Sequence, residues 1–291
     1  MRRAPILLAA ALALLLAACG RTSGPAQDPS VPEESVPLES ASPAPTETAE
    51  GTDAPESPAP TESGAPETAE PVWTDQVFAE DITAADGTVV MSVDYVFPAI
   101  EDAGSVPAWQ KISDYYTQEG KAYMDTAREL AGYAEGDYEV AQVMGEDFLP
   151  YGESHSYRIA YQGGGVVSIV RSYYANSVTG AAHPANYQFS EQFDLETGDA
   201  LTLSAFFSDF TTAREEILDL LAQKAAGAGY TREDLAGQFN ESYFYLTEEG
   251  FVFYYQPDTL APYAAGLLEF SIPYGELEDL LARPVWEGTA S

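Results

Sequence analysis

The side chains that could do chemistry in this sequence are few, and most of them are carboxylates. The 291-residue chain contains two histidines, His155 and His183, and one cysteine, Cys19. Two histidines cannot form a three-histidine zinc site or a His-Glu-x-x-His helix, and one cysteine excludes the usual thiolate clusters. We therefore predict no metal site and no cofactor.

Motifs for nucleophilic or phosphate chemistry are also missing. No serine lies in a Gly-x-Ser-x-Gly elbow, and Gly163-Gly164-Gly165 is read as a turn because no helix pattern follows it. His183 could act as a general base. Alternatively, its ring forms hydrogen bonds with backbone groups of its own corner loop. We therefore expect that the protein has no catalytic residue and is not an enzyme. An uncharacterised carboxylate-based wall hydrolase stays open, because a glycosidase pair is invisible in sequence.

Cys19 stands at the end of an export signal. Met1-Arg2-Arg3 is positive, residues 4–18 are apolar, and Leu16-Ala17-Ala18-Cys19 fits a lipobox. The apolar run is shorter than the ~20 residues that span a bilayer. An ordinary cleaved signal peptide with a chance cysteine is the alternative. The sequence predicts a lipoprotein signal peptide at 1–19, lipidation of Cys19 and anchoring to the outer face of the bacterial cytoplasmic membrane.

Charge and composition divide the rest of the chain. Residues 20–72 contain eleven prolines and eleven acidic residues against one arginine, which predicts a disordered stalk. Residues 73–291 carry thirty-six acidic and nine basic side chains. Such an excess attracts cationic partners and repels nucleic acid and anionic lipid, although a merely solubilising surface would have the same composition.

The candidate residues lie on a predicted meander between residues 154 and 203. A strand with period-two Tyr157, Ile159 and Tyr161 is followed by the glycine turn, and a central strand is predicted at 166–174. A wide corner at 176–184 then leads to an aromatic strand that ends at Leu195, and Leu201 and Leu203 are read as a return strand.

The elements around this meander are hairpins and helices. A hairpin at 77–82 and 88–97 precedes a helix that Ser105 caps, that Pro107 begins and whose apolar face reaches Leu130. A Thr212–Glu215 capping box predicts a second main helix. A short helix near residue 231, strands at 242–247, 251–255 and 267–272, and a helix at 274–282 complete the chain. The predicted class is α+β: an antiparallel β-meander sheet with two main helices packed on it, preceded by the disordered stalk.

The meander and the strands after it resemble a known family. The matching stretches are Tyr173-Tyr174, the loop from Thr179 to His183, Asp194 to Gly198, Phe244 to Tyr255, Ala261 to Gly266 and Phe270 to Tyr274. Together they resemble the extracellular domain of RsiV-type anti-sigma factors, and the part before them is similar to the domain that precedes the catalytic module of PdaC-type peptidoglycan deacetylases. The resemblance places a PdaC-type domain at 73–185 and an RsiV-like domain at 186–291, and we expect the two to pack together as one unit. Ala181 and Pro184 depart from the family pattern, which predicts a different path for this loop.

The resemblance implies a partner. RsiV-type domains are known as lysozyme receptors, so we expect non-catalytic capture of a lysozyme-type muramidase or another cationic protein, without the sigma-factor segment that lies across the membrane in that family. The alternative partner is peptidoglycan glycan, bound through tyrosines. Constrained loops that carry tyrosine are good contact sites. The predicted binding residues are Tyr174, His183, Tyr187, Pro262 and Tyr263.

Replacement of the acceptor cysteine tests the anchor. Cys19→Ala removes the thiol that carries the lipid, so we expect the protein in the soluble exported fraction or as an uncleaved precursor, measured by membrane fractionation and mass. Correct processing with unchanged membrane partition of the variant would contradict the lipoprotein prediction.

Overall fold

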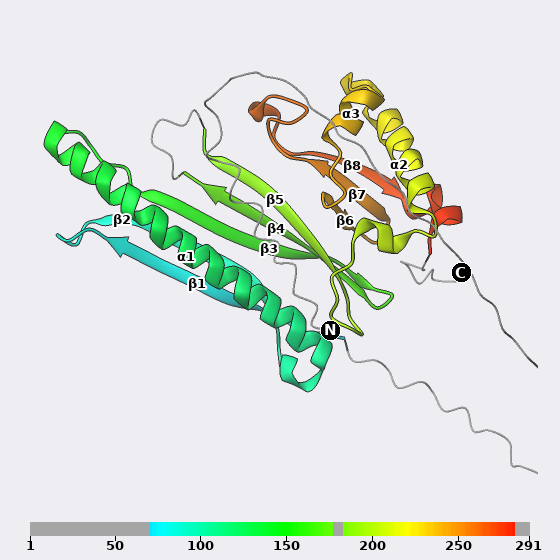
Figure 1. The fold of residues 1–291 in the computed structure, drawn as a ribbon, viewed down its shortest axis with the longest axis horizontal. Helices are drawn as coiled ribbons and strands as arrows, with labels where there is room; N and C mark the ends of the chain where they lie inside the picture. The colour runs from blue at the N-terminus through cyan, green and yellow to red at the C-terminus, as the bar shows by residue number, and fades with distance from the viewer. Residues whose placement is uncertain (1–69, 177–182, 283–291) are drawn as a thin grey trace, which may run out of the picture. The chain divides into compact units, whose positions relative to one another are not determined.

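The computed structural model describes residues 70–176 and 183–282. They belong to one compact unit over residues 65–291, and the described part of this unit contains two β-sheets and three α-helices (Figure 1). The α+β class is confirmed. Cys19, almost all of the predicted stalk, and Thr179 and Ala181 of the corner loop lie outside the described residues.

The larger sheet has five strands in chain order. The predicted hairpin and the first three meander strands are present, with bounds that differ from the predicted ones by a few residues, whereas the predicted return strand through Leu201 is reduced to an isolated bridge between Phe193 and Ala200. The strands are β1 (Trp73–Thr83), β2 (Val89–Ile100), β3 (Tyr151–Gly163), β4 (Val166–Ala175) and β5 (Ala185–Asp194).

One strand pair in this sheet is parallel. Helix α1 (Pro107–Met144) returns the chain along β2, so that β3 starts beside the start of β2, with Met91 opposite Tyr151. A connection of this length is what parallel strands require. The other neighbouring strands pair antiparallel, as predicted.

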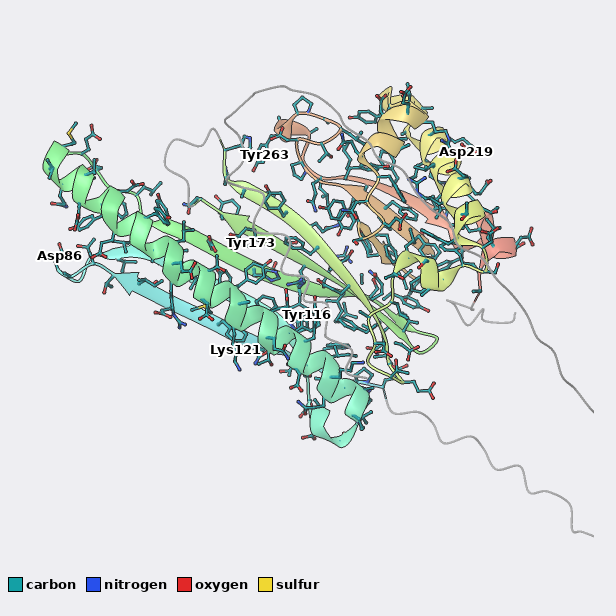
Figure 2. All side chains as sticks on the ribbon, viewed as in Figure 1. Asp86, Tyr116, Lys121, Tyr173, Asp219 and Tyr263 are labelled. Atoms are coloured by element: carbon teal, nitrogen blue, oxygen red, sulfur yellow. The ribbon has the colours of Figure 1, made fainter. Side chains whose placement is uncertain are left out.

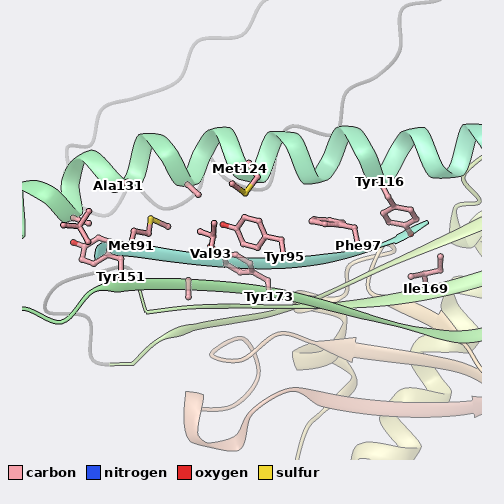
Figure 3. Close-up of a cluster of buried hydrophobic side chains, with 14 of the residues drawn as sticks. Met91, Val93, Tyr95, Phe97, Tyr116, Met124, Ala131, Tyr151, Ile169 and Tyr173 are labelled. Carbon is pink, nitrogen blue, oxygen red and sulfur yellow. The ribbon is translucent and has the colours of Figure 1, made fainter. Parts of the chain in front are cut away.

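Helix α1 covers one face of the sheet, called the helix-side face here, along β2 (Figure 3). It begins at Pro107 and ends at Gly145, whose φ of 71° suits a glycine cap. The prediction that Ser105 caps this helix is wrong, because Val106 is the N-cap and makes no side-chain cap bond. The helix also runs 14 residues past Leu130. Its buried face meets the aromatic and aliphatic side chains of β2, with these main contributors: Ile112, Tyr116, Met124, Ala127, Ala131, Met91, Val93, Tyr95 and Phe97.

The second sheet contains β6 (Phe244–Leu246), β7 (Gly250–Tyr255) and β8 (Leu268–Pro273), as predicted. Helices α2 (Phe210–Ala225) and α3 (Arg232–Gln238) accompany it, and Thr231 and Asp234 form a capping box for α3. Asp209, not Thr212, caps α2, because its carboxylate accepts from the Thr212 N–H at 3.2 Å. The predicted helix at 274–282 is instead two 3-10 turns, and Leu203 begins a 3-10 turn instead of ending a strand.

Small polar side chains attach the second sheet to the outer face of the first, the face away from α1. The Leu246 N–H donates to Ser168 Oγ at 3.0 Å, and Gln192 Nε2 donates to the Phe244 carbonyl at 2.9 Å. The predicted boundary between residues 185 and 186 falls at the start of β5, which pairs with β4 over its whole length. Residues on both sides of that boundary therefore share one sheet.

Within residues 70–176 and 183–282, no helix is both long enough and apolar enough to cross a bilayer.

Two glycines of α1 give a matched test of the packing. A Cβ on Gly120 would lie 2.2 Å from the ring of Phe78 on β1, whereas a Cβ on Gly132 would meet nothing within 4 Å. We expect Gly120→Ala to lower the free energy of unfolding by ~1–3 kcal/mol through overpacking. Gly132→Ala should raise it by ~0.5–1 kcal/mol, because alanine favours a helix. Chemical denaturation measures both, and a stabilising Gly120→Ala would contradict the close approach of α1 and β1.

Candidate binding surface

The surface predicted to bind a partner forms where β5 begins and β7 ends. Gln256, the residue after β7, holds the two strands together through its side-chain amide. The Gln188 N–H donates to Gln256 Oε1 at 3.1 Å, and Gln256 Nε2 donates to the Gln188 carbonyl at 2.5 Å. The amide thus replaces a strand neighbour for β5 and positions the loop that follows β7 beside residue 183.

Two predicted residues from distant parts of the sequence meet at this point. The rings of His183 and Tyr263 stack with centroids 3.7 Å apart and planes 10° apart. His183 Nε2 lies 3.2 Å from Asp258 Oδ2, and Nδ1 lies 3.2 Å from the Pro184 carbonyl. Both edges of the imidazole are therefore held. We call His183, Asp258, Pro262 and Tyr263 the His183 rim; Figure 2 shows Tyr263 near the start of β5.

The backbone of the rim is constrained. Asp258 has a φ of 64°, a left-handed conformation that aspartate and asparagine adopt more readily than other side chains. Pro262 is exposed and immediately precedes the 3-10 turn Tyr263–Ala265, which places Tyr263 against His183. The loop after β7 therefore has few backbone alternatives where it presents Asp258 and the Tyr263 ring beside His183.

The other two predicted residues lie elsewhere on the sheet. Tyr187 pairs with Tyr173 across β4 and β5 and packs, half-buried, on the helix-side core. Tyr174 points to the outer face, because successive side chains of a strand alternate. The structure thus places Tyr174 and Tyr187 on opposite faces, so the two cannot belong to one contact patch of the sheet.

Tyr174 borders a hollow on the outer face of the sheet. The tyrosine is 45% exposed, and the hollow has a volume of about 320 Å³ and is wide open to solvent. Its other lining residues are mostly small or acidic: Asp81, Ser92, Val93, Asp94, Gly152, Glu153, Ser154 and Asn176.

The electrostatics of the described surface follow from ion pairing. Six of the eight lysines and arginines within residues 70–176 and 183–282 already have a carboxylate partner: Lys111, Arg128, Arg171, Arg214, Lys224 and Arg232. Of the other two, Arg158 lies over the ring of Tyr245, 4.7 Å from its centroid. Few basic groups are left to balance the remaining carboxylates, so the described surface is strongly acidic.

Sequence reasoning missed a charged cluster on the helix-side face. Arg171 of β4 is buried and donates from Nε to both Glu191 carboxylate oxygens, at 3.1 and 3.0 Å. Its Nη2 lies 3.7 Å from a Glu119 oxygen of α1, and its Nη1 lies 3.4 Å from His155 Nε2. A guanidinium can only donate, so Nε2 accepts and the proton of the neutral ring lies on Nδ1.

Burial and charge shift the titration of this cluster. Burial, followed by the positive charge of Arg171, lowers the pKa of His155 from 6.5 to about 3. Burial raises the pKa of Glu119, and Arg171 opposes this shift. No group of three or more His, Cys, Asp or Glu side chains that could hold a metal ion occurs among residues 70–176 and 183–282.

One sequence signal could have found Arg171. In β4 the odd positions 167, 169 and 173 are buried and apolar, so an arginine at the intervening odd position needs a buried partner. The identity of that partner was not visible, because Glu191 and Glu119 come from β5 and α1 and their proximity depends on the sheet register.

Part of the chain matches a known family model. Residues 204–275 match the family model described as "Protein of unknown function (DUF3298)". The match spans α2, α3 and the second sheet and lies within the C-terminal domain predicted at 186–291. No curated protein matches the sequence.

Solved structures extend the likeness to most of the chain. A DUF3298 family member from Bacteroides fragilis is 18% identical, with a TM-score of 0.57 over 74% of this chain and 95% of that one. A DUF3298 family protein from Pseudomonas aeruginosa is 15% identical, with a TM-score of 0.50 over 73% of this chain and 95% of that one. At these identities the likeness shows a shared fold.

The cluster around Arg171 can be tested in the His183→Ala variant, in which His155 is the single remaining histidine and can be titrated by itself. The unfolded chain binds a proton on the His155 ring below its ordinary pKa of 6.5, whereas the folded protein does so only near 3. We therefore expect this group to lower the free energy of unfolding as the pH falls from 6.5 towards 3. The imidazole nitrogen signals should show a neutral ring, protonated at Nδ1, at pH 5. A titration midpoint near 6.5 would contradict burial beside Arg171.

Proposed function

We propose that this protein is a non-catalytic binding lipoprotein of the cell envelope that captures a cationic protein, such as a lysozyme-type muramidase. The observation that carries the proposal is the acidic surface. With six of eight described basic side chains already paired, the unpaired charge that a partner meets is overwhelmingly negative. Such a field accelerates association with basic proteins.

The His183 rim is the proposed contact within that surface. Tyrosine supplies a large contact area at little entropic cost, and the stack with His183 holds the Tyr263 ring in place before a partner binds. Asp258 adds a carboxylate beside the stack. The rim thus combines an aromatic anchor with a charge complementary to lysine or arginine.

The resemblance to RsiV-type lysozyme receptors supports this partner class, since His183 and Tyr263 both lie in stretches that carry it. The lipidated Cys19 would hold the protein at the outer face of the membrane, and the acidic stalk would extend the binding unit from it. Lysozyme captured there is kept from the cell wall, or is sensed through a partner protein.

A peptidoglycan glycan is the second candidate, favoured by the hollow beside Tyr174. A partly exposed tyrosine next to an open hollow with serine and carboxylate groups offers stacking and hydrogen bonds to a sugar. Ionic strength separates the two candidates. Charge-steered protein capture weakens as salt is added, whereas stacking on a neutral sugar changes little.

Two substitutions in the rim test the proposed contact. Tyr263→Ala removes the stacked ring, and Asp258→Asn removes a charge while keeping a side chain that tolerates positive φ. We expect each to weaken binding of a lysozyme-type muramidase by ~1 kcal/mol or more, about fivefold in Kd, without a change in melting temperature. Calorimetric titration at low and high salt measures the effect.

Asp102 provides the matched control. It is the other described non-glycine residue with positive φ, at 50°, and it is exposed between β2 and α1, at the opposite end of the sheet. Asp102→Asn removes the same charge from the same backbone conformation. Equal losses for Asp102→Asn and Asp258→Asn would remove the rim from the site and leave only a diffuse acidic surface.

A further inference from the structure

The exposed apolar side chains of the described chain are concentrated at one place. Eight large apolar residues are exposed, and five of them lie between residues 133 and 149. They are between 61% and 86% exposed, and they are Tyr133, Val140, Val143, Met144 and Leu149. We call these five residues the α1 apolar patch.

The patch is uncovered because α1 extends beyond the end of the β1–β2 hairpin. At 38 residues the helix is about 57 Å long, whereas the 12-residue β2 is about 40 Å long. Near the end of the helix, Tyr138 contacts the β1–β2 hairpin through its hydroxyl, which donates to Asp86 at 2.7 Å. Between residues 139 and 147 no residue is buried. Figure 1 shows this end of α1 extending past the β1–β2 hairpin.

Three members of the patch form a stripe along the helix. Tyr133, Val140 and Met144 are spaced i, i+7 and i+11, which places them within about 40° of one another around the axis. The buried residues Ala127, Ala131 and Ala134 lie about 80° or more away around the axis. A solvent-facing helix surface is ordinarily polar, so this stripe is an apolar surface without a partner in the described unit.

The charged side chains along the patch are negative. Residues 129–157 contain no lysine or arginine, and Arg128, just before them, is paired with Glu80. Exposed carboxylates flank the apolar side chains on the helix and just after it, at Glu129, Glu139, Glu146 and Asp147. A partner must therefore bring an apolar surface and positive charge together.

We propose that the α1 apolar patch binds a cationic amphipathic polypeptide, whose apolar face covers the stripe and whose lysines or arginines pair with the flanking carboxylates. A helix of the partner lying along α1 would bury Val140, Val143 and Met144. A second copy of this chain would oppose acid to acid, and anionic lipid or nucleic acid would be repelled. The proposal does not rest on the His183 rim, because it concerns other residues.

A designed peptide tests this site in the immobilised full chain, held through its N-terminal end. The probe is an 18-residue helical peptide with leucines on one face and lysines on the other. Its controls are a scrambled peptide without an apolar face and a peptide with glutamates in place of the lysines. We expect only the lysine–leucine helix to bind, with an affinity that falls as salt is added.

The variants use matched valines. Val140→Ser with Met144→Ser should raise the Kd for the peptide about tenfold or more. Val77→Ser, which changes a valine of similar exposure (59%) on β1, should leave it within about twofold. Tyr263→Ala should also leave peptide binding unchanged, so failure of this site and failure of the rim are distinguishable. Circular dichroism confirms that the variants remain folded.

Several outcomes overturn the proposal. Equal binding of the peptide to wild type and to Val140→Ser/Met144→Ser would show that the peptide binds at another site. Equal binding of the scrambled or the glutamate peptide removes the requirement for an amphipathic cation. A dimer in sedimentation that the double variant dissociates would show that the patch is an interface between copies of this chain.

Discussion

A buried positive charge in the middle of β4 is the constraint on which the arrangement of the larger sheet depends. A desolvated guanidinium without partners costs several kcal/mol, and Arg171 obtains its partners from three other elements: Glu191 of β5, Glu119 of α1 and His155 of β3. Burial alone would lower the pKa of Arg171, but the carboxylate of Glu191 keeps this pKa above its ordinary value. A shift of α1 along the sheet, or a slip in strand register, would break this set of contacts. The cluster therefore fixes the frame at whose end the His183 rim and the outer-face hollow lie.

The binding features follow from that frame. Because β3 starts beside the start of β2, the β1–β2 hairpin, the end of α1 and the start of β5 lie at one end of the sheet. The second sheet covers only part of the outer face, where Ser168, Ser190 and Gln192 meet β6, and leaves Tyr174 exposed. Gln256 then brings the loop after β7 to residue 183. An acidic surface with few unpaired basic groups surrounds these features, which is why a cationic partner is the class that we propose.

Much of the fold could be predicted from local patterns, and the failures have physical causes. Period-two runs and the glycine turn located β3, β4 and β5, since these signals lie within a few residues. Thr212 looked like a helix cap, but Asp209, three residues earlier, offers the same bond to the backbone with a charged acceptor. The parallel pairing of β2 and β3 was not predicted, because it depends on the path of a 38-residue helix. The stack of His183 on Tyr263 and the Arg171 cluster join residues 16 to 80 positions apart, and only the assembled sheets bring them together.

Hydrogen–deuterium exchange of the full chain with and without a lysozyme-type muramidase tests capture at the His183 rim most directly, because it reports which backbone amides a bound partner protects. Capture at the rim predicts that, at low salt, the bound muramidase slows exchange in residues 183–190 and 256–266. Exchange in residues 101–106, at the opposite end of the sheet, should change little. At high salt the protection should be lost. Unchanged exchange in 183–190 and 256–266 at a saturating muramidase concentration would contradict it.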